Sequence, residues 1–287
     1  MKKNEVKIFK YGTIAPFYGL IIAISALPSF YAIYTSFTDK TLFSEEWHFI
    51  GLANFITAFK DPVFWLALKN NIFYGFFCTF FQVTLGLGVA LLLLKPFKGN
   101  SIGRGVIVFP YLVPTIVAVM TFKWLLNDLY GIVNHALLRL GVIEQGISWL
   151  GPSFAMFTVI LVAVWRYLPF AVLLFLPGLQ AIPGEYYDAA KIDGANSIKR
   201  FIHITLPQMK HVFLIVALLR GIWMFNDFDV IWLLTKGGPV KRTLHIPILS
   251  YTEAFRQYDI AQGSATAVAG FIILLVPIIL YFRSTRE

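Results

Sequence analysis

Long runs of apolar residues divide the chain into segments that can cross a lipid bilayer. The hydrocarbon core of a bilayer is about 30 Å thick, so a spanning helix needs about 20 mostly apolar residues. Six runs reach or approach this length, and several of them contain almost no charge. The pattern therefore predicts six transmembrane helices, at residues 14–37, 72–94, 105–126, 153–181, 212–235 and 264–282.

The composition supports an all-α polytopic membrane protein and leaves no room for a soluble domain. Apolar residues make up 58% of the 287 residues and charged residues 14%, whereas a soluble chain carries about 25% charge. We therefore expect residues 1–287 to form a single transmembrane domain. The basic N-terminus also fits a signal peptide, but its apolar run of 24 residues is too long and no clear cleavage site follows. It is expected to remain as the first span.

The distribution of lysine and arginine predicts the orientation in the membrane. With the N-terminus inside, the cytoplasmic segments hold 13 of these residues and the opposite segments hold 8, on longer loops. Cytoplasmic loops carry the excess of positive charge, so both termini are expected in the cytoplasm of a bacterial-type plasma (inner) membrane. The net charge of +9 therefore reflects membrane topology, and no nucleic-acid partner is expected.

Residues 182–210, between the fourth and fifth predicted spans, form the longest segment on the predicted cytoplasmic side. Pro183 suits the start of a short helix, and Glu185 and Asp188 place negative charge near the positive end of its dipole. Gly194 suits the left-handed residue that ends a helix. A first short helix is therefore expected before Gly194.

A second helical segment is expected over residues 197–205, and Leu206-Pro207 is expected to end it. Ala189 and Ala190 give the first helix a smooth patch that could seat against another protein. A solvated helical connector is an equally good interpretation on physical grounds alone.

The spacing of these residues resembles the EAA motif of ATP-binding-cassette importer permeases. Asp188-Ala189-Ala190 is followed by Gly194 and then by Ile204-x-Leu206-Pro207, a pattern that covers twenty positions. The first position is Asp where Glu is usual, which shortens the side chain and keeps its charge. In that family the loop is a coupling helix that docks into a groove on an ATPase subunit. The coupling residues implied by the resemblance are Glu185, Asp188, Ala189, Ala190, Gly194, Ile204, Leu206 and Pro207.

Two further stretches, residues 51–64 and 223–239, resemble the carbohydrate-uptake branch of that family, most closely the first permease of maltose and glycerol-phosphate importers. The resemblance implies a type I importer permease fold and the uptake of a sugar or oligosaccharide. It also implies a second homologous permease subunit, two ATPase subunits and an extracytoplasmic solute-binding protein as partners. The chain has no GxxxxGK[ST] phosphate-binding loop, so ATP and Mg are expected on the partner ATPase, with no cofactor in this chain.

Charged and aromatic residues within the predicted spans mark a candidate substrate site. A charge at the bilayer centre costs about 2.5–3.5 kcal/mol on insertion scales, so it normally faces a cavity or a partner. Arg220, Trp223 and Asp227 have the i, i+3, i+7 spacing of one helical face, and Asn226 lies at its edge. Aromatic faces with a few polar groups suit a sugar. The alternative is structural: Arg220 and Asp227 could pair, and the aromatic residues could face lipid.

Further candidates lie at positions that look similar to the sugar contacts of maltose-type permeases. The full set of candidate substrate-binding residues is Tyr111, Thr115, Trp165, Arg166, Tyr167, Phe170, Arg220, Trp223, Asn226 and Asp227.

Three alternatives concern the substrate and the class of protein. Arg166 and Arg220 could favour an anionic sugar or a glycerol phosphate, but Asp227 and Asp229 could neutralise them, and a neutral sugar is expected. A secondary transporter or channel would need no ATPase, but no clear internal repeat is found. A membrane-embedded enzyme is disfavoured, because the five histidines lack metal-ligand spacing and no nucleophile–base pair stands out. Neither a metal site nor a catalytic site is expected.

Overall fold

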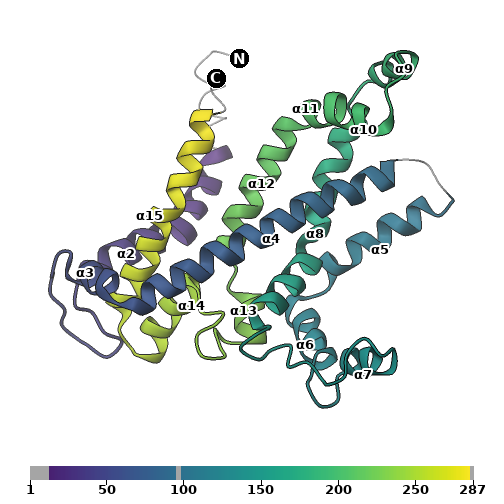
Figure 1. Ribbon diagram of the computed structural model, residues 1–287. Coiled ribbons are helices and arrows are strands. Elements are labelled where there is room, and N and C mark those ends of the chain that lie inside the picture. Colours follow the sequence, from purple (N-terminus) through teal and green to yellow (C-terminus); the bar gives the residue numbers. More distant parts are fainter. Residues whose placement is uncertain (1–12, 95–97, 285–287) are drawn as a thin grey trace, which may run out of the picture. The chain divides into compact units, whose positions relative to one another are not determined.

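The computed structural model describes residues 13–94 and 98–284, which are helical over most of their length (Figure 1). They form two compact units, residues 13–65 with Leu249–Leu275 and Leu66–Ile248 with residues 276–284. The predicted all-α class is confirmed. Both termini, whose cytoplasmic placement is predicted, lie outside the described residues, and the single transmembrane domain stays a prediction.

Four helical stretches of the described chain are long and apolar enough to cross a membrane: Thr13–Thr35, Pro62–Leu94, Ala155–Gln180 and Ile260–Arg283. Two bent helix pairs, Asn100–Leu112 with Thr115–Leu125 and Ser197–Gln208 with Lys210–Phe225, bring the number to six if each pair is one span. A helix or a bent helix pair therefore lies at the position of each predicted span, but the second, third and fifth differ from the prediction in their bounds or continuity.

The first unit contains the N-terminal span and most of α15 (Ile260–Ser284). The N-terminal span includes the π-helical turn η1 (Ile22–Ala26) and α2 (Leu27–Thr35), and its most apolar stretch of 18 residues buries no side chain within this chain. α3 (Ala53–Lys60) follows it, and η3 (Thr252–Arg256) packs closely on the start of α15. The bare apolar surface of the first span fits contact with lipid or with another membrane helix.

Helix α4 (Pro62–Leu94) begins ten residues before the predicted span 72–94. Its start is favourable, because a proline loses no hydrogen bond there and the Asp61 carboxylate accepts from the Val63 N–H at 2.8 Å. Asn70 and Asn71 interrupt the apolar pattern, which is why the prediction began later. Both asparagines donate to backbone carbonyls of other segments within the second unit, so they pack inside the fold rather than ending the helix.

The third span is bent by 95° between α5 (Asn100–Leu112) and α6 (Thr115–Leu125). Pro114 explains the bend. Its ring excludes helical backbone at Val113, which is extended with φ −69° and ψ 133°. The proline also lacks the N–H that would bond the carbonyl of residue 110, so that oxygen is left for another donor.

The predicted fifth span 212–235 is not one continuous helix. Helix α12 (Lys210–Phe225) ends early, and residues 226–228 separate it from α13 (Asp229–Leu234). The break lies at Asp227, whose backbone oxygen is contacted by His245 Nε2 at 2.7 Å. A carbonyl with a partner outside its helix can leave the helix without being unsatisfied.

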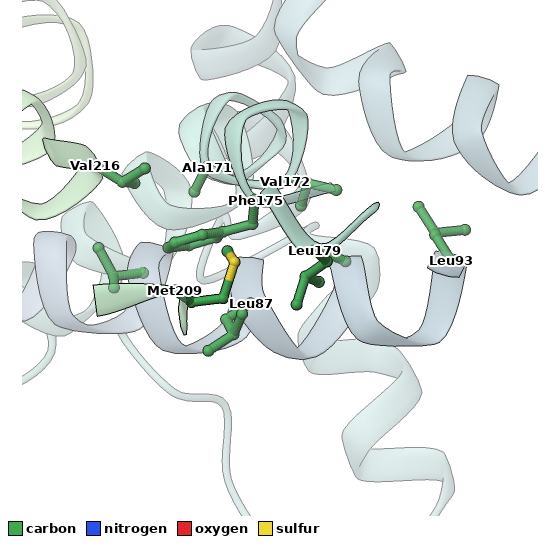
Figure 2. Packing of buried hydrophobic residues seen from close by; sticks show 10 residues of the cluster. Leu87, Leu93, Ala171, Val172, Phe175, Leu179, Met209 and Val216 are labelled. Carbon is green, nitrogen blue, oxygen red and sulfur yellow. The ribbon is translucent and has the colours of Figure 1, made fainter. Parts of the chain in front are cut away.

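Helix α8 (Ala155–Gln180) closely matches the fourth predicted span and runs through Pro169 and Pro177. Figure 2 shows the apolar cluster that holds it in the second unit, where Phe175 and Leu179 of α8 lie beside Met209, Val216 and Leu87. The cluster joins α8 to α4 and to the start of α12. It positions the polar side chains nearer the middle of these helices.

The remaining short helices of the second unit lie towards the two ends of α8 (Figure 1). α9 (Gly184–Ile192) and α10 (Ser197–Arg200) follow its C-terminal end, whereas α7 (Ile132–Arg139) lies at the other end. The helix α14 (Ile246–Tyr251) connects the two units along the chain.

Candidate functional site

Arg166 of α8 holds the bend in the third span. Its guanidinium donates through Nη1 to the Pro110 carbonyl, the oxygen that Pro114 cannot bond, and through Nη2 to Thr115 Oγ1 at 3.3 Å. It also lies 5.7 Å from the ring centroid of Tyr111, within the range of a cation–π contact. The charged guanidinium of Arg166 therefore provides the hydrogen bond that the Pro110 carbonyl lacks at the bend, and both of its acceptors are neutral.

Arg220 of α12 is the largest fully buried side chain among the residues that the structure describes, with 1% of its surface exposed. Its Nε donates to Gln82 Oε1 at 2.6 Å, and its guanidinium carbon lies 5.3 Å from the Trp223 ring centroid and 5.6 Å from that of Phe170. Gln82 is itself fully buried in α4. A buried guanidinium is thus held by a neutral amide and by aromatic faces.

Asp227, in the break after α12, lies at the centre of a hydroxyl-rich group. Its carboxylate accepts from the hydroxyl of Tyr74 on α4 and, at 3.4 Å, from that of Tyr167 on α8. His245 Nε2 donates to the backbone oxygen of Asp227, which assigns the proton of the neutral imidazole to Nε2. Burial lowers the pKa of His245 to about 4, so this imidazole is neutral at physiological pH.

Tyr167 links the three charged residues. The guanidinium carbon of Arg166 lies 5.6 Å from its ring centroid and that of Arg220 lies 5.0 Å from it, while its hydroxyl reaches Asp227. The two guanidinium carbons are therefore no more than about 10.6 Å apart, the sum of those two distances. We call Arg166, Tyr167, Arg220, Asp227 and their contacts the polar cluster.

The polar cluster contains most of the predicted substrate residues, but not for the predicted reason. Asp227 does not share a helical face with Arg220, because α12 ends between them. Arg220 and Asp227, both within the described part of the chain, bond to other partners and form no ion pair with each other, so the alternative of an Arg220–Asp227 pair is not realised. The cluster is assembled by tertiary contacts across α4, α8 and α12.

Two predicted residues lie apart from these contacts. The Trp165 ring packs on Phe122 of α6, with centroids 4.9 Å apart. Asn226 is exposed, and its amide donates to the Ile222 carbonyl of its own helix at 2.9 Å. Their role as substrate contacts stays a prediction.

The predicted coupling segment contains the expected helix and turn. α9 is exposed, with Glu185 in its first turn, and Gly194 follows it with a φ of +75°. Asp188 and Lys191 form an exposed ion pair at 2.7 Å, and the hydrogen bond and charge of Lys191 lower the pKa of the Asp188 carboxyl. Ala189 lies beside this pair on the exposed helix, and Ala190 is partly covered.

Contrary to the prediction, the second helical segment does not stop at Leu206-Pro207. It passes from α10 through the π-helical turn η2 (Phe201–Thr205) into α11 (Leu206–Gln208), and the 67° bend comes at Met209. Pro207 is the second residue of α11, and the helical backbone runs past it to Gln208. Ile204 is partly exposed, and Leu206 and Pro207 are exposed.

A family model described as "Binding-protein-dependent transport system inner membrane component" matches residues 82–286. The chain belongs to this family. The permease is 34% identical, over 100% of its length and 96% of the relative's, to the trehalose/maltose transport system permease protein MalF of Thermococcus litoralis. It is 33% identical, over 95% of its length and 89% of the relative's, to the sulfoquinovosyl glycerol transport system permease protein SmoG of Agrobacterium fabrum.

A solved structure shares the fold of the permease. A chain of a bacterial ABC transporter involved in the import of the acidic polysaccharide alginate superposes with a TM-score of 0.85 at 18% identity, covering 99% of the permease and 97% of that chain. The type I importer permease fold and the resemblance to carbohydrate-uptake permeases are thereby confirmed. In this family a separate subunit hydrolyses ATP, so the permease is not itself an ATPase.

Sequence reasoning missed three residues of the polar cluster: Tyr74, Gln82 and His245. Gln82 could have been found, because an amide in the middle of an apolar span must have a buried partner or a cavity to face. Tyr74 lies in a stretch rich in phenylalanine, and His245 lies outside every predicted span. Neither of these two carries a local signal of its contact with Asp227.

Proposed function

We propose that this permease carries a sugar or oligosaccharide through the membrane as half of an ATP-driven importer. In this proposal a second homologous permease forms the other half, an extracytoplasmic binding protein delivers the sugar, and two ATPase subunits with Mg and ATP supply the energy. The outer segments 127–152 and 236–263 would receive the binding protein. Both termini would lie in the cytoplasm.

The polar cluster is the observation that carries the proposal. It places two guanidinium groups, one carboxylate and the rings of Tyr111, Tyr167, Phe170 and Trp223 among apolar spans. Aromatic faces cover the C–H side of a sugar ring, and charged hydrogen-bonding groups orient its hydroxyls. The name of a 34%-identical relative as a trehalose/maltose permease supports the same substrate class.

The exposed coupling segment supports the ATPase partner. Apolar side chains are left in solvent along it, including Ile192 at 87% and Ile198 at 69% exposure. An exposed apolar surface on a short helix beside Gly194 suits a docking contact with another protein. Cysteine labelling of the termini from each side of the membrane tests the orientation on which this partner depends.

Reconstitution in proteoliposomes tests the proposal directly. The permease with its partner permease, ATPase and binding protein should import sugar only when ATP is present on the side of the membrane where the ATPase lies. The sugar-loaded binding protein should stimulate the hydrolysis of ATP. Sugar transport by the permease alone, driven by an ion gradient, would instead establish a secondary transporter and refute the proposal. The cognate sugar should also raise the Tm of the binding protein, because a ligand stabilises the state that binds it.

Replacing Gly194 with valine tests the docking role. The left-handed backbone at φ +75° disfavours a β-branched residue, so the turn after α9 should be distorted and hydrolysis uncoupled from transport. Gly99→Val is a matched control, because Gly99 is also left-handed, with open space around it, but lies outside the coupling segment. Unchanged sugar uptake by inserted Gly194→Val permease would contradict the docking role.

An anionic sugar is the second candidate substrate, favoured by one observation. Both buried guanidinium groups donate to neutral acceptors, and the carboxylate of Asp227 accepts from tyrosine hydroxyls. A bound carboxylate or sulfonate would provide the missing opposite charge. Competition of a neutral disaccharide with its uronate analogue for uptake separates the two: inhibition by the uronate alone would select the anionic substrate.

A further inference from the structure

The docking helix α9 is weakly anchored to the rest of the permease. All of its residues are described, and none is buried. The backbone leaves it through Gly194, where the left-handed conformation is surrounded by open space. The ion pair between Asp188 and Lys191 stays within the helix. A push on α9 would therefore be absorbed by the turn unless a side chain ties the helix to the segment that follows.

Tyr187 supplies such a tie. Its side chain is partly buried, and its hydroxyl lies 2.9 Å from the hydroxyl of Thr205 in η2. Among the described hydrogen-bonded side chains between Gly184 and Gln208, this pair alone joins α9 to the second helical segment. Thr205 is 4% exposed, so the bond is shielded from water on that side.

Thr205 continues the connection inward. Its backbone oxygen accepts from the N–H of Met209 at 3.0 Å, directly at the 67° bend before α12. Met209 is 1% exposed, and a Cβ placed on Gly178 of α8 would meet its methyl carbon at 3.1 Å and its sulfur at 3.2 Å. Figure 2 shows Met209 among Phe175 and Leu179 of α8. The side chain of Thr205 thus contacts α9, and its main chain bonds Met209 in the apolar core.

We propose that the Tyr187–Thr205 hydroxyl pair is a latch that makes α9 and the base of the fifth span move as one body. The inference rests on the proposed docking of an ATPase at α9. Closure of the ATPase displaces α9, the latch carries the displacement to Thr205, and the core contact of Met209 passes it to α8 and α12. Arg166 and Arg220 lie on those two helices, so the latch connects nucleotide-driven motion to the polar cluster.

The latch acts as a positioning device, and its loss should change coupling more than assembly. One neutral hydrogen bond shifts an equilibrium by about 2- to 10-fold, which is the expected change in the number of ATP molecules hydrolysed per sugar imported. Tyr187→Phe and Thr205→Val each remove one hydroxyl with little change in shape. Each should raise this ratio by about that factor, while the amount of co-purified ATPase stays unchanged.

Two controls separate the latch from a general disturbance of the loop. Thr205→Ser keeps the hydroxyl and should keep the ratio of the unmodified permease. Tyr186→Phe removes a hydroxyl from the neighbouring position on α9, where the side chain is 51% exposed, and should also leave the ratio unchanged. The double variant Tyr187→Phe/Thr205→Val should be no worse than either single variant, because both remove the same bond.

Normal coupling in both Tyr187→Phe and Thr205→Val would overturn the latch, and so would an equal loss in the two control variants. The proposed function fails separately. If Gly194→Val uncouples the importer and Tyr187→Phe does not, the docking role stands and the latch alone is wrong. If Gly194→Val imports sugar normally, the docking role itself is lost.

Discussion

The pairing of Gln82 with Arg220 leads to a sharp prediction about stability. In the unmodified permease the Arg220 Nε–H donates to Gln82 Oε1 at 2.6 Å. In Gln82→Leu this N–H is left buried without its acceptor. In Arg220→Met the amide of Gln82 is left buried without its charged donor. The double variant replaces both groups by apolar side chains of similar length.

The magnitude follows from the burial of both partners. Hydrogen bonds between membrane helices contribute about 0.6 kcal/mol on average, because the unfolded chain in the bilayer also finds partners. Removing one partner from a buried bond to a charged group costs more, about 1.5–3 kcal/mol, because the desolvated charge remains. Arg220 is 1% exposed and Gln82 is fully buried, so the larger figure applies. We expect Gln82→Leu to lower the free energy of unfolding by about 2 kcal/mol.

The double variant decides whether the pair itself is responsible. Replacing both partners of a buried polar pair by apolar groups is often nearly neutral, so the double variant should be more stable than the sum of the single losses predicts. Unfolding of the purified permease in detergent, followed by tryptophan fluorescence against denaturant, measures all four proteins. Additive losses within about 0.3–0.5 kcal/mol would show that the two side chains act independently and would refute the reasoning.

Three further predictions concern other parts of the fold. A Cβ on Gly86 would lie 2.7 Å from a side-chain carbon of α8, so Gly86→Leu should force α4 and α8 apart and cost about 1–3 kcal/mol in detergent unfolding, whereas Gly88→Leu, in open space, should not. Pro114→Ala restores a backbone N–H that competes with Arg166 for the same carbonyl, so sugar uptake should fall by about tenfold while the amount of inserted permease stays the same, and unchanged uptake would count against the role of the bend. Burial raises the pKa of Glu253, in the segment before α15, from 4.5 to about 7. Since the folded state then binds this proton more tightly than the unfolded state, the free energy of unfolding should fall as pH rises from about 4.5 to about 7, and Glu253→Gln should flatten this part of the pH profile.

The spans could be predicted because bilayer crossing is a local property. About 20 apolar residues in succession identify a helix whatever it packs against, and all six runs reappear as helices or bent helix pairs. The bend at Pro114 is also a local effect, because the proline ring restricts the residue before it. The break at Asp227 is different, since the apolar pattern continues on both sides and the partner of its carbonyl, His245, is 18 residues away.

The two short helices of the coupling segment were also predicted, because the residues that mark their ends lie next to them in the sequence. Gly194 marks the end of α9, and Asn196 starts the next helix by accepting the Lys199 N–H at 2.9 Å. The extension of the second helix past Pro207 was missed, because a proline inside a helix usually breaks it. The contact of Tyr187 with Thr205 could not be predicted, because it depends on how the two short helices fold back on each other.

By itself, the sequence determined that this chain has apolar segments long enough to cross a membrane, four of them single helices and two more if each bent helix pair is one span, and that a short helix ends before Gly194. Only the tertiary structure decided which polar groups meet inside: Gln82 reaches Arg220 across 138 positions, and Tyr74 reaches Asp227 across 153. The reason is physical. Hydrophobicity and backbone preference act on each residue and its neighbours in the chain, whereas a buried charge is stable only where the packing of distant helices brings it a partner.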